Sequence, residues 1–113
     1  MATIYDALVD STRRQILDLL RERPRMVCEL VDQVQISQPL MSKHLKVLRE
    51  VGLVTVRQDA QRRWYELQPE PLAEVDAWLA SYRSLLEARL NRLDDYLNTL
   101  QNAKREGMPD DER

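Results

Sequence analysis

The 113-residue sequence predicts a mainly α-helical fold with one small β-hairpin and a long helix near its end. Three patterns support this fold class. Residues 36–54 carry apolar residues at helical spacing, residues 54–67 alternate between apolar and polar, and leucines recur every seven residues after Pro71. The length fits one domain, which we place at residues 1–101, and the charged residues 102–113 are expected to form a disordered tail.

Two short helices are expected at the start of the chain. Ile4 and Leu8 have the spacing of one helix face and indicate the first helix. Asp10 or Ser11 can cap the second helix, which we expect to end before Pro24. The buried residues of this second helix should be its apolar ones, namely Ile16, Leu17, Leu19 and Leu20.

Two further helices, at residues 27–34 and 38–50, are separated by only three residues. Ser37 is a good N-cap because its hydroxyl can accept a backbone N–H, and Pro39 stands in the first turn, where a missing N–H costs nothing. Gly52 can adopt the left-handed conformation that ends a helix. Two short helices joined by such a turn are typical of a helix-turn-helix, whose second helix binds DNA.

The helix at 38–50 has one face for packing, formed by Met41, Leu45 and Leu48, and one face for contact. The contact face and its edges carry mostly amide, hydroxyl and cationic side chains: Gln38, Pro39, Ser42, Lys43, Lys46 and Arg49. Such donors suit phosphates and base edges, so the helix is a candidate recognition helix. Taken alone, the same pattern is equally compatible with an ordinary solvated basic face.

Residues 54–67 are predicted to form a two-stranded hairpin whose inward residues are Val54, Val56, Tyr65 and Leu67. Its outward positions include Arg57, Arg62 and Arg63, and a basic hairpin beside a helix-turn-helix is typical of the wing of a winged helix. Residues 36–63 hold six Lys or Arg and two acidic residues, whereas the whole chain has a net charge of −2 and a pI near 5.4. Positive charge is therefore concentrated in the region expected to meet DNA.

A long helix is expected from Pro71 or Leu72 to Gln101. At 1.5 Å per residue it would be about 45 Å long, which is too long to be buried by one small domain. Its heptad of leucines favours pairing with the same helix of a second copy. The residues expected in this dimer interface are Leu79, Tyr82, Leu86, Leu90, Leu93 and Leu97. The alternative is that the stripe covers the domain's own core. A basic leucine zipper is disfavoured, because two prolines and a hairpin precede the helix.

In combination, residues 10–20, 37–49, 52–54 and 62–67 resemble the ArsR family of bacterial winged-helix repressors, over a region that extends from Tyr5 to about Leu100. The resemblance implies a homodimer that binds a pseudo-palindromic operator near its own promoter and blocks transcription. It assigns the DNA contacts to Gln38, Pro39, Ser42, Lys43 and Lys46, assisted by Arg62 and Arg63, and assigns Ile4 and Leu8 to the dimer interface. Where glycine is usual at the wing turn, this sequence has residues 58–61 without glycine.

Many members of the ArsR family sense metals, but their ligand patterns are missing from this sequence. Met26 stands where a second cysteine would accompany Cys28, and the single histidine, His44, lies in the expected recognition helix. One thiol cannot supply the three or four ligands of a zinc or arsenite site. The chain therefore resembles the metal-independent, autorepressor-like branch of the family. We expect no metal and no cofactor, and the sequence identifies no small-molecule effector.

Two alternative functions remain open. Cys28 is expected to be a small buried hydrophobic residue, but a reactive thiol at this position would make the protein a thiol- or metalloid-responsive repressor. The second alternative is a dimeric helical adaptor that does not bind DNA and pairs through its last helix.

Catalysis is not expected, because no second histidine accompanies His44 and the chain has two glycines, too few for a glycine-rich phosphate loop. The residues after Met1 lack the pattern of a signal peptide, and no apolar run has the length of a membrane span. A single cysteine allows no intramolecular disulfide, so a cytoplasmic location is expected.

Overall fold

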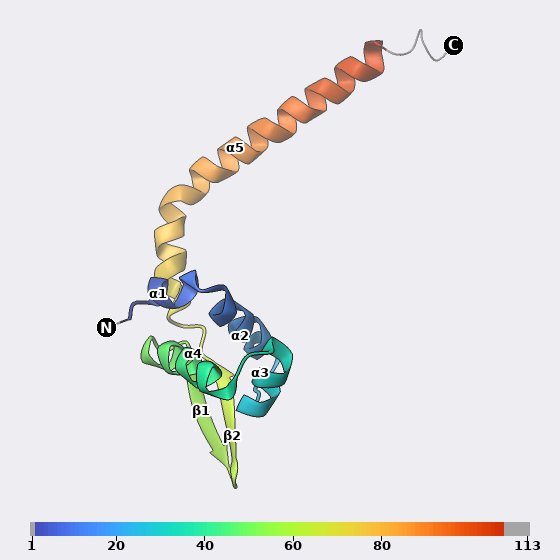
Figure 1. Ribbon diagram of the computed structural model, residues 1–113. Helices are drawn as coiled ribbons and strands as arrows, with labels where there is room; N and C mark the ends of the chain where they lie inside the picture. Colours follow the sequence, from blue (N-terminus) through green and yellow to red (C-terminus); the bar gives the residue numbers. More distant parts are fainter. Residues whose placement is uncertain (1, 108–113) are drawn as a thin grey trace. The chain divides into compact units, whose positions relative to one another are not determined.

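The computed structural model describes residues 2–107, with side chains up to Lys104, and confirms a mainly helical fold with one β-hairpin. The elements follow in the order α1 (Ile4–Val9), α2 (Ser11–Glu22), α3 (Val27–Val34), α4 (Gln38–Glu50), β1 (Val54–Asp59), β2 (Arg62–Leu67) and α5 (Leu72–Gly107) (Figure 1). The contacts divide the chain between Asp76 and Ala77 into two compact units. The first unit ends after the first turn of α5, and the second contains the rest of that helix.

The first two helices begin at side-chain caps. The Thr3 hydroxyl accepts the Asp6 amide at 3.2 Å, and the Asp6 carboxylate accepts the Thr3 amide at 2.8 Å, which forms a capping box at the start of α1. Of the two caps considered for α2, the structure uses Asp10, whose carboxylate accepts the amides of Thr12 and Arg13 at 2.8 and 3.1 Å. Local hydrogen bonds therefore fix both helix starts.

The ends of α3 and α4 depend on residues with positive φ. Gly52 follows α4 with a φ of 81°, as its position in the sequence predicted. Gln35 ends α3 with a φ of 66° and donates its amide to the Val31 carbonyl at 2.8 Å. The positive φ of Gln35 could not be predicted from the sequence, because glycine, asparagine and aspartate are the residues that adopt this conformation readily.

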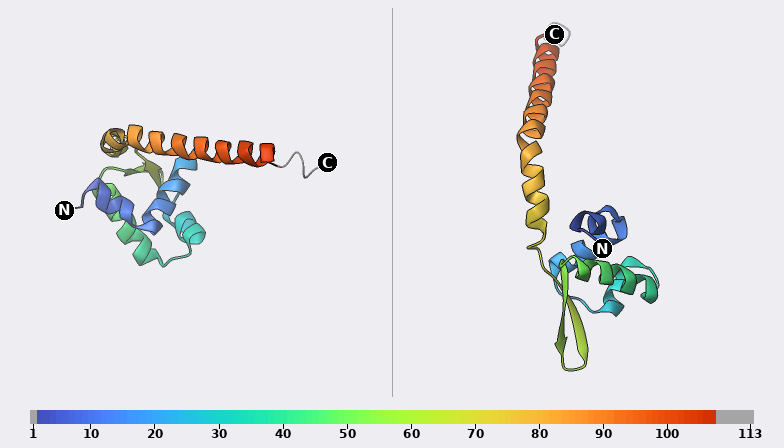
Figure 2. Two further views of the ribbon diagram at one scale, coloured as in Figure 1. Left: turned by 90° about the horizontal axis from the view of Figure 1, so that it is seen from above. Right: turned by 90° about the vertical axis from the view of Figure 1, so that its left-hand side faces the viewer.

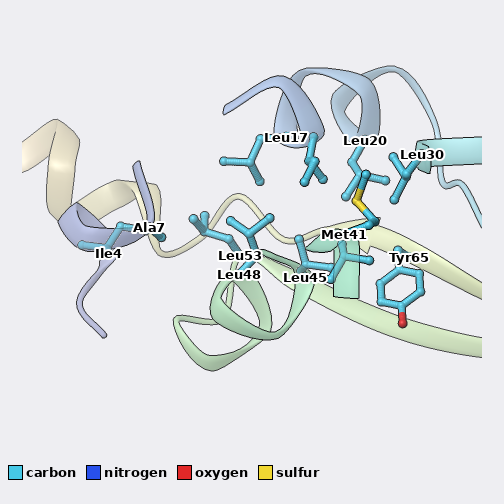
Figure 3. Close-up of a cluster of buried hydrophobic side chains, with 12 residues drawn as sticks. Ile4, Ala7, Leu17, Leu20, Leu30, Met41, Leu45, Leu48, Leu53 and Tyr65 are labelled. Carbon is cyan, nitrogen blue, oxygen red and sulfur yellow. The ribbon is translucent and has the colours of Figure 1, made fainter. Parts of the chain in front are cut away.

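The core of the first unit lies between α2, α4 and the hairpin. Its buried apolar residues are Ile4, Ala7, Ile16, Leu17, Leu20, Leu30, Met41, Leu45, Leu48, Leu53, Val54 and Tyr65. Figure 3 shows side chains of α2, such as Leu17 and Leu20, facing those of α4 across this core. Leu19, expected to be buried, is half-buried at the edge of the cluster. Burial of this set supplies the main stabilisation of the unit and orients α4.

The expected hairpin is present, and β1 pairs antiparallel with β2 from Val54 opposite Leu67 to Asp59 opposite Arg62. The two residues between the strands make the turn, and Ala60 takes the positive φ, 57°, that glycine usually supplies. The structure thus forms a tight wing turn without glycine. Backbone hydrogen bonds of 2.8 and 3.1 Å between Arg25 and Tyr65 also attach β2 to the segment before α3. Figure 2 shows the hairpin projecting from the helices of the first unit.

Helix α5 continues to Gly107, six residues beyond the expected end at Gln101. The expected disordered tail at 102–113 is therefore helical in its first half, because Ala103 and the charged residues after it are good helix formers. The rest of that expected tail, 108–113, lies outside the described residues. Leu72 and Val75 pack against the core of the first unit, but every described side chain from Ala77 onward is exposed. No helix in residues 2–107 combines the length and the apolar character of a bilayer-spanning segment.

Candidate nucleic-acid interface

Helix α4 begins where the sequence predicted, because the Ser37 hydroxyl accepts the Leu40 amide at 3.3 Å and Pro39 lies in the first turn. Met41, Leu45 and Leu48 are at most 2% exposed and fix one face of the helix against the core. All six residues expected on the contact face are exposed: Gln38, Pro39, Ser42, Lys43, Lys46 and Arg49. The structure therefore brings these candidates together on one surface of one rigid helix.

One apolar residue joins this surface. Leu40, in the first turn of α4, is 42% exposed although it is a large hydrophobic residue. Leu40 was not among the residues expected on the contact face, since a leucine in an amphipathic helix is normally buried in the core. At the start of a helix presented to DNA, such a side chain can contact a thymine methyl group or a sugar.

His44 lies at the side of α4 and is half-buried. Its Nδ1 atom is 3.3 Å from Nη1 of Arg13, whose other nitrogens donate to the carbonyls of Ala7 and Asp6 at 2.9 and 2.8 Å. Arg14 likewise donates to the Leu8 carbonyl at 2.7 Å. Both arginines thus satisfy carbonyls at the end of α1.

The carboxylate of Asp10 belongs to the same cluster. Its pKa lies below the ordinary value mainly because it accepts the backbone amide of Arg13, and the amide of Thr12 adds to this effect. The nearby charges of His44 and Arg13 lower the pKa further. The negative form of Asp10 is therefore favoured in the folded chain, at the N-terminus of α2, where the helix dipole also prefers an anion.

The three candidate arginines of the wing differ in their surroundings. Arg57 donates from Nε to the Glu66 carboxylate at 2.6 Å across the two strands, and Asp59 lies 4.0 Å from its Nη1. The hydrogen bond to Glu66 raises the pKa of Arg57. Arg62 and Arg63 are exposed at the start of β2 and form no ion pair within the described residues. Charge available for a ligand is thus concentrated near the hairpin tip.

The cationic side chains of α4 also lack an acidic partner among the described residues. Lys43, Lys46 and Arg49 form no ion pair in the part of the chain that the structure describes. The hairpin projects from the first unit next to α4, and the two elements are in contact through β1 (Figures 1 and 2). One unit therefore offers two neighbouring cationic features, an exposed helix face and a hairpin tip, which suit a polyanion.

Cys28 is exposed, in the first turn of α3, so the expectation that it is buried was wrong. The apolar face of this short helix turns Leu30 inward and leaves position 28 on the outside. Residues 2–107 contain no group of three or more His, Cys, Asp or Glu side chains arranged to hold a metal ion.

The residues expected in the dimer interface fall into two groups. Those of α5 are all exposed, by 45% to 58%: Leu79, Tyr82, Leu86, Leu90, Leu93 and Leu97. Those of α1 differ, because Leu8 is half-buried while Ile4 is only 6% exposed. The side chain of Ile4 thus packs in the core of its own unit, whereas its role in a dimer interface stays a prediction. Val9, 76% exposed, is the apolar residue that α1 leaves at the surface.

Near Leu8, the first unit has an open groove of about 320 Å³. It is bounded by α1, α2, β2 and the first turn of α5, and its lining is formed by Leu8, Arg14, Leu17, Asp18, Arg21, Leu67 and Leu72. The lining therefore combines leucines with three charged side chains.

Comparisons with known proteins match the helix-turn-helix region. A family model described as "Bacterial regulatory protein, arsR family" matches residues 10–56, from the cap of α2 into β1. The arsenical resistance operon repressor of Staphylococcus aureus is 40% identical over 75 residues, which cover 66% of this chain and 72% of that protein. The arsenic resistance transcriptional regulator ArsR1 of Pseudomonas putida is 42% identical over 77 residues, or 67% of this chain and 60% of that protein.

A solved structure extends the likeness to the fold. The crystal structure of an ArsR family transcriptional regulator superposes with a TM-score of 0.65 at 33% sequence identity, covering 74% of this chain and 87% of that one. The resemblance inferred from the sequence motifs is confirmed by these matches, as is the winged helix-turn-helix fold class.

Proposed function

Because the chain belongs to the ArsR family of bacterial regulatory proteins, which bind DNA and regulate transcription, we propose that it is a homodimeric repressor of a pseudo-palindromic operator. The observation that carries this proposal is the construction of α4. Its apolar face is locked into the core by Met41, Leu45 and Leu48, while its cationic face is exposed and has no internal partner.

In this proposal α4 enters the major groove with its N-terminal turns against the bases. Gln38 and Ser42 are short enough to approach base edges closely, and an amide can bond an adenine bidentately. Lys43, Lys46 and Arg49 extend from the same face and reach phosphates or guanine edges. The positive end of the helix dipole adds to the attraction for phosphate.

The wing supplies a second contact on the flank of each half-site. Arg62 and Arg63 bind phosphates or the adjacent minor groove, since neither is held by an acidic residue among the described residues. Arg57 was expected to contact DNA as well. Its pairing with Glu66 supports a mainly structural role in joining the two strands.

Two copies of the chain pair through the exposed leucines of α5, and the dimer then carries two α4 helices, one for each half-site. The half-sites of such an operator lie about 34 Å apart in successive major grooves. A dimer bound at a promoter excludes the transcription machinery, which gives repression. Relatives of the chain are named for arsenical resistance, but the chain has a single thiol to offer a metalloid site. We therefore propose repression that does not require a metal.

A thiol-responsive repressor is the second candidate, and the exposure of Cys28 favours it. Oxidation or metalloid binding at Cys28 would alter the start of α3, which packs against α4. Release of the protein from DNA by peroxide or arsenite, abolished by Cys28→Ser, would support this candidate. A wild-type complex that is stable to both reagents, or a variant that still responds, would eliminate it.

The DNA-binding proposal is tested with the DNA around the protein's own gene. Anisotropy titrations should give saturable binding, with log affinity falling linearly with log salt at a slope of about −5 to −10. Lys43→Ala and Lys46→Ala should each weaken binding about tenfold by loss of a charged contact, without change in folding. Lys104→Ala in α5 is the matched control and should leave the affinity unchanged. Absence of a saturable shift at low salt would instead favour the helical adaptor that does not bind DNA.

A further inference from the structure

His44, the single histidine of the chain, makes one side-chain contact that determines where its proton lies. Its Nδ1 atom is 3.3 Å from Nη1 of Arg13, in the first turn of α2. A guanidinium stays protonated and has no lone pair to offer, so Nδ1 is the acceptor in this contact. The neutral imidazole then carries its proton on Nε2, which makes that nitrogen a donor.

The Nε2 atom of His44 has no hydrogen-bond partner among the described residues. Every buried side-chain nitrogen or oxygen of these residues has a partner, so Nε2 is open to solvent although the ring is half-buried. The carboxylate of Asp10 lies near the imidazole but accepts the backbone amides of Thr12 and Arg13 instead. The imidazole is thus held by the protein at one nitrogen and has a free donor at the other.

This donor lies at one edge of the cationic face of α4. Leu40, one helical turn before His44, shares that edge and is 42% exposed, whereas Gln38 and Arg49 lie at the opposite edge. The edges of a helix in a groove are nearest to the sugar-phosphate backbone, and the middle of its exposed face is nearest to the bases. A phosphate oxygen accepts strongly from such an N–H, and the positive charge of Arg13 adds to the attraction.

We propose that His44 donates a hydrogen bond from Nε2 to a DNA phosphate, and that Arg13 is the positioning residue that holds the ring and its tautomer for this contact. The inference rests on the proposed function and adds an uncharged phosphate contact on the edge of α4 opposite to Arg49. Arg13 suits this role because its Nε and Nη2 are anchored on the carbonyls of Ala7 and Asp6, at 2.9 and 2.8 Å. An imidazole held in this way loses little conformational entropy on binding.

Two amide substitutions distinguish the two nitrogens of the ring. Glutamine places an N–H near the position of Nε2, whereas the shorter asparagine reaches only the position of Nδ1. In anisotropy titrations, His44→Gln should keep the DNA Kd of the wild type within about threefold, while His44→Asn and His44→Ala should each raise it about tenfold. The glutamine and asparagine variants are matched controls, and equal thermal midpoints show that folding does not cause the difference.

The salt dependence distinguishes this contact from a cationic one. His44→Ala should leave the slope of log affinity against log salt unchanged, because a neutral donor releases no counterion. Lys43→Ala is the comparison and should reduce the magnitude of the slope by about 1. A reduced slope in His44→Ala would mean that the imidazole is charged in the complex and would overturn the assigned tautomer.

A double-mutant cycle tests the positioning role of Arg13. Arg13→Lys keeps the charge, but an ammonium group lacks the planar fork that makes all three contacts. It should raise the DNA Kd about threefold in the wild-type background and leave it unchanged when His44 is already alanine. An equal effect in both backgrounds would mean that Arg13 only stabilises α1, and would overturn its positioning role.

Nuclear magnetic resonance reads the tautomer directly, since every imidazole nitrogen signal of the full chain belongs to His44. At about pH 7.5 the signals of the free protein should show the proton on Nε2, and bound DNA should protect this proton from exchange with water. A proton on Nδ1 would overturn the role of Arg13. Wild-type affinity in all three His44 variants, or no recovery with glutamine, would overturn the phosphate contact and leave the repressor proposal in place. Absence of saturable DNA binding by the wild type would overturn both.

Discussion

Helices α4 and α5 are built from the same kinds of residue but present opposite faces. In α4 the apolar face is buried in its own unit and the cationic face is exposed, whereas the leucines of α5 from Leu79 onward are about half exposed. The face that remains uncovered indicates the partner: cationic donors suit DNA, and a leucine seam suits another helix. Both helices are amphipathic, so amphipathicity alone does not indicate which partner each of them binds.

The largest effect is expected for a substitution in the buried apolar face of α4. Leu48→Ala removes a side chain that is 0% exposed in α4 and should lower the free energy of unfolding by about 2–5 kcal/mol through cavity formation. Denaturant titration should give the same loss at every protein concentration. The matched change Leu93→Ala in α5 should instead act through dimerisation, and its effect should diminish as the protein is diluted. A loss independent of concentration in Leu93→Ala would contradict the contrast between the helices.

A charged substitution on the exposed side should separate the two copies. Leu93→Asp places a carboxylate among the exposed leucines of α5, through which the two copies are proposed to pair. The dimer Kd should rise by at least about 100-fold, because the charge is desolvated without a partner. Operator affinity should fall with it, since a monomer contacts one half-site. Sedimentation and anisotropy measure the two effects. Ala88→Asp carries the same charge on the outer face and should leave the dimer intact.

Smaller effects are expected in the wing, where substitutions test which arginines bind DNA. Arg62→Ala should weaken operator binding by about three- to tenfold and reduce the magnitude of the salt slope by about 1. Arg57→Ala should have a weaker effect on affinity, because the Arg57 guanidinium is already paired with the carboxylate of Glu66. Equal losses in the two variants would mean that Arg57 exchanges Glu66 for phosphate in the complex.

The smallest expected effect is on pH dependence. The folded state lowers the pKa of Asp10 below its ordinary value of 3.8, because the carboxylate accepts the backbone amides of Arg13 and Thr12. The stability it contributes is therefore complete above that ordinary value and is lost as pH falls through the lower folded value. Asp10→Asn should cost at most about 1 kcal/mol at pH 7. Its thermal midpoint should fall less steeply than that of the wild type below about pH 4.

The limits of α4 could be predicted because their signals are local. Ser37, Pro39 and Gly52 act within one helical turn, so a short stretch of sequence contains the whole determinant. The same is true of the contact face, where every expected residue is exposed. Its role in binding DNA stays a prediction until it is measured.

Features that depend on distant residues could not be predicted in this way. The pairing of Arg57 with Glu66 follows from the strand register, and the position of Ile4 in the core follows from how α1 packs on α2. The exposure of Cys28 follows from the rotation of α3 on the core. In each case the side chain was compatible with two environments, and tertiary packing selected one of them.

The guanidinium of Arg13 has a practical consequence for handling the protein. Its three contacts join two carbonyls of α1 to the imidazole of His44 in α4, so a displacement of α1 is transmitted to α4 through one side chain. We therefore expect an affinity tag fused directly ahead of α1 to perturb operator binding more than the same tag attached after residue 113. Purification from the carboxyl end is the safer design for any binding measurement.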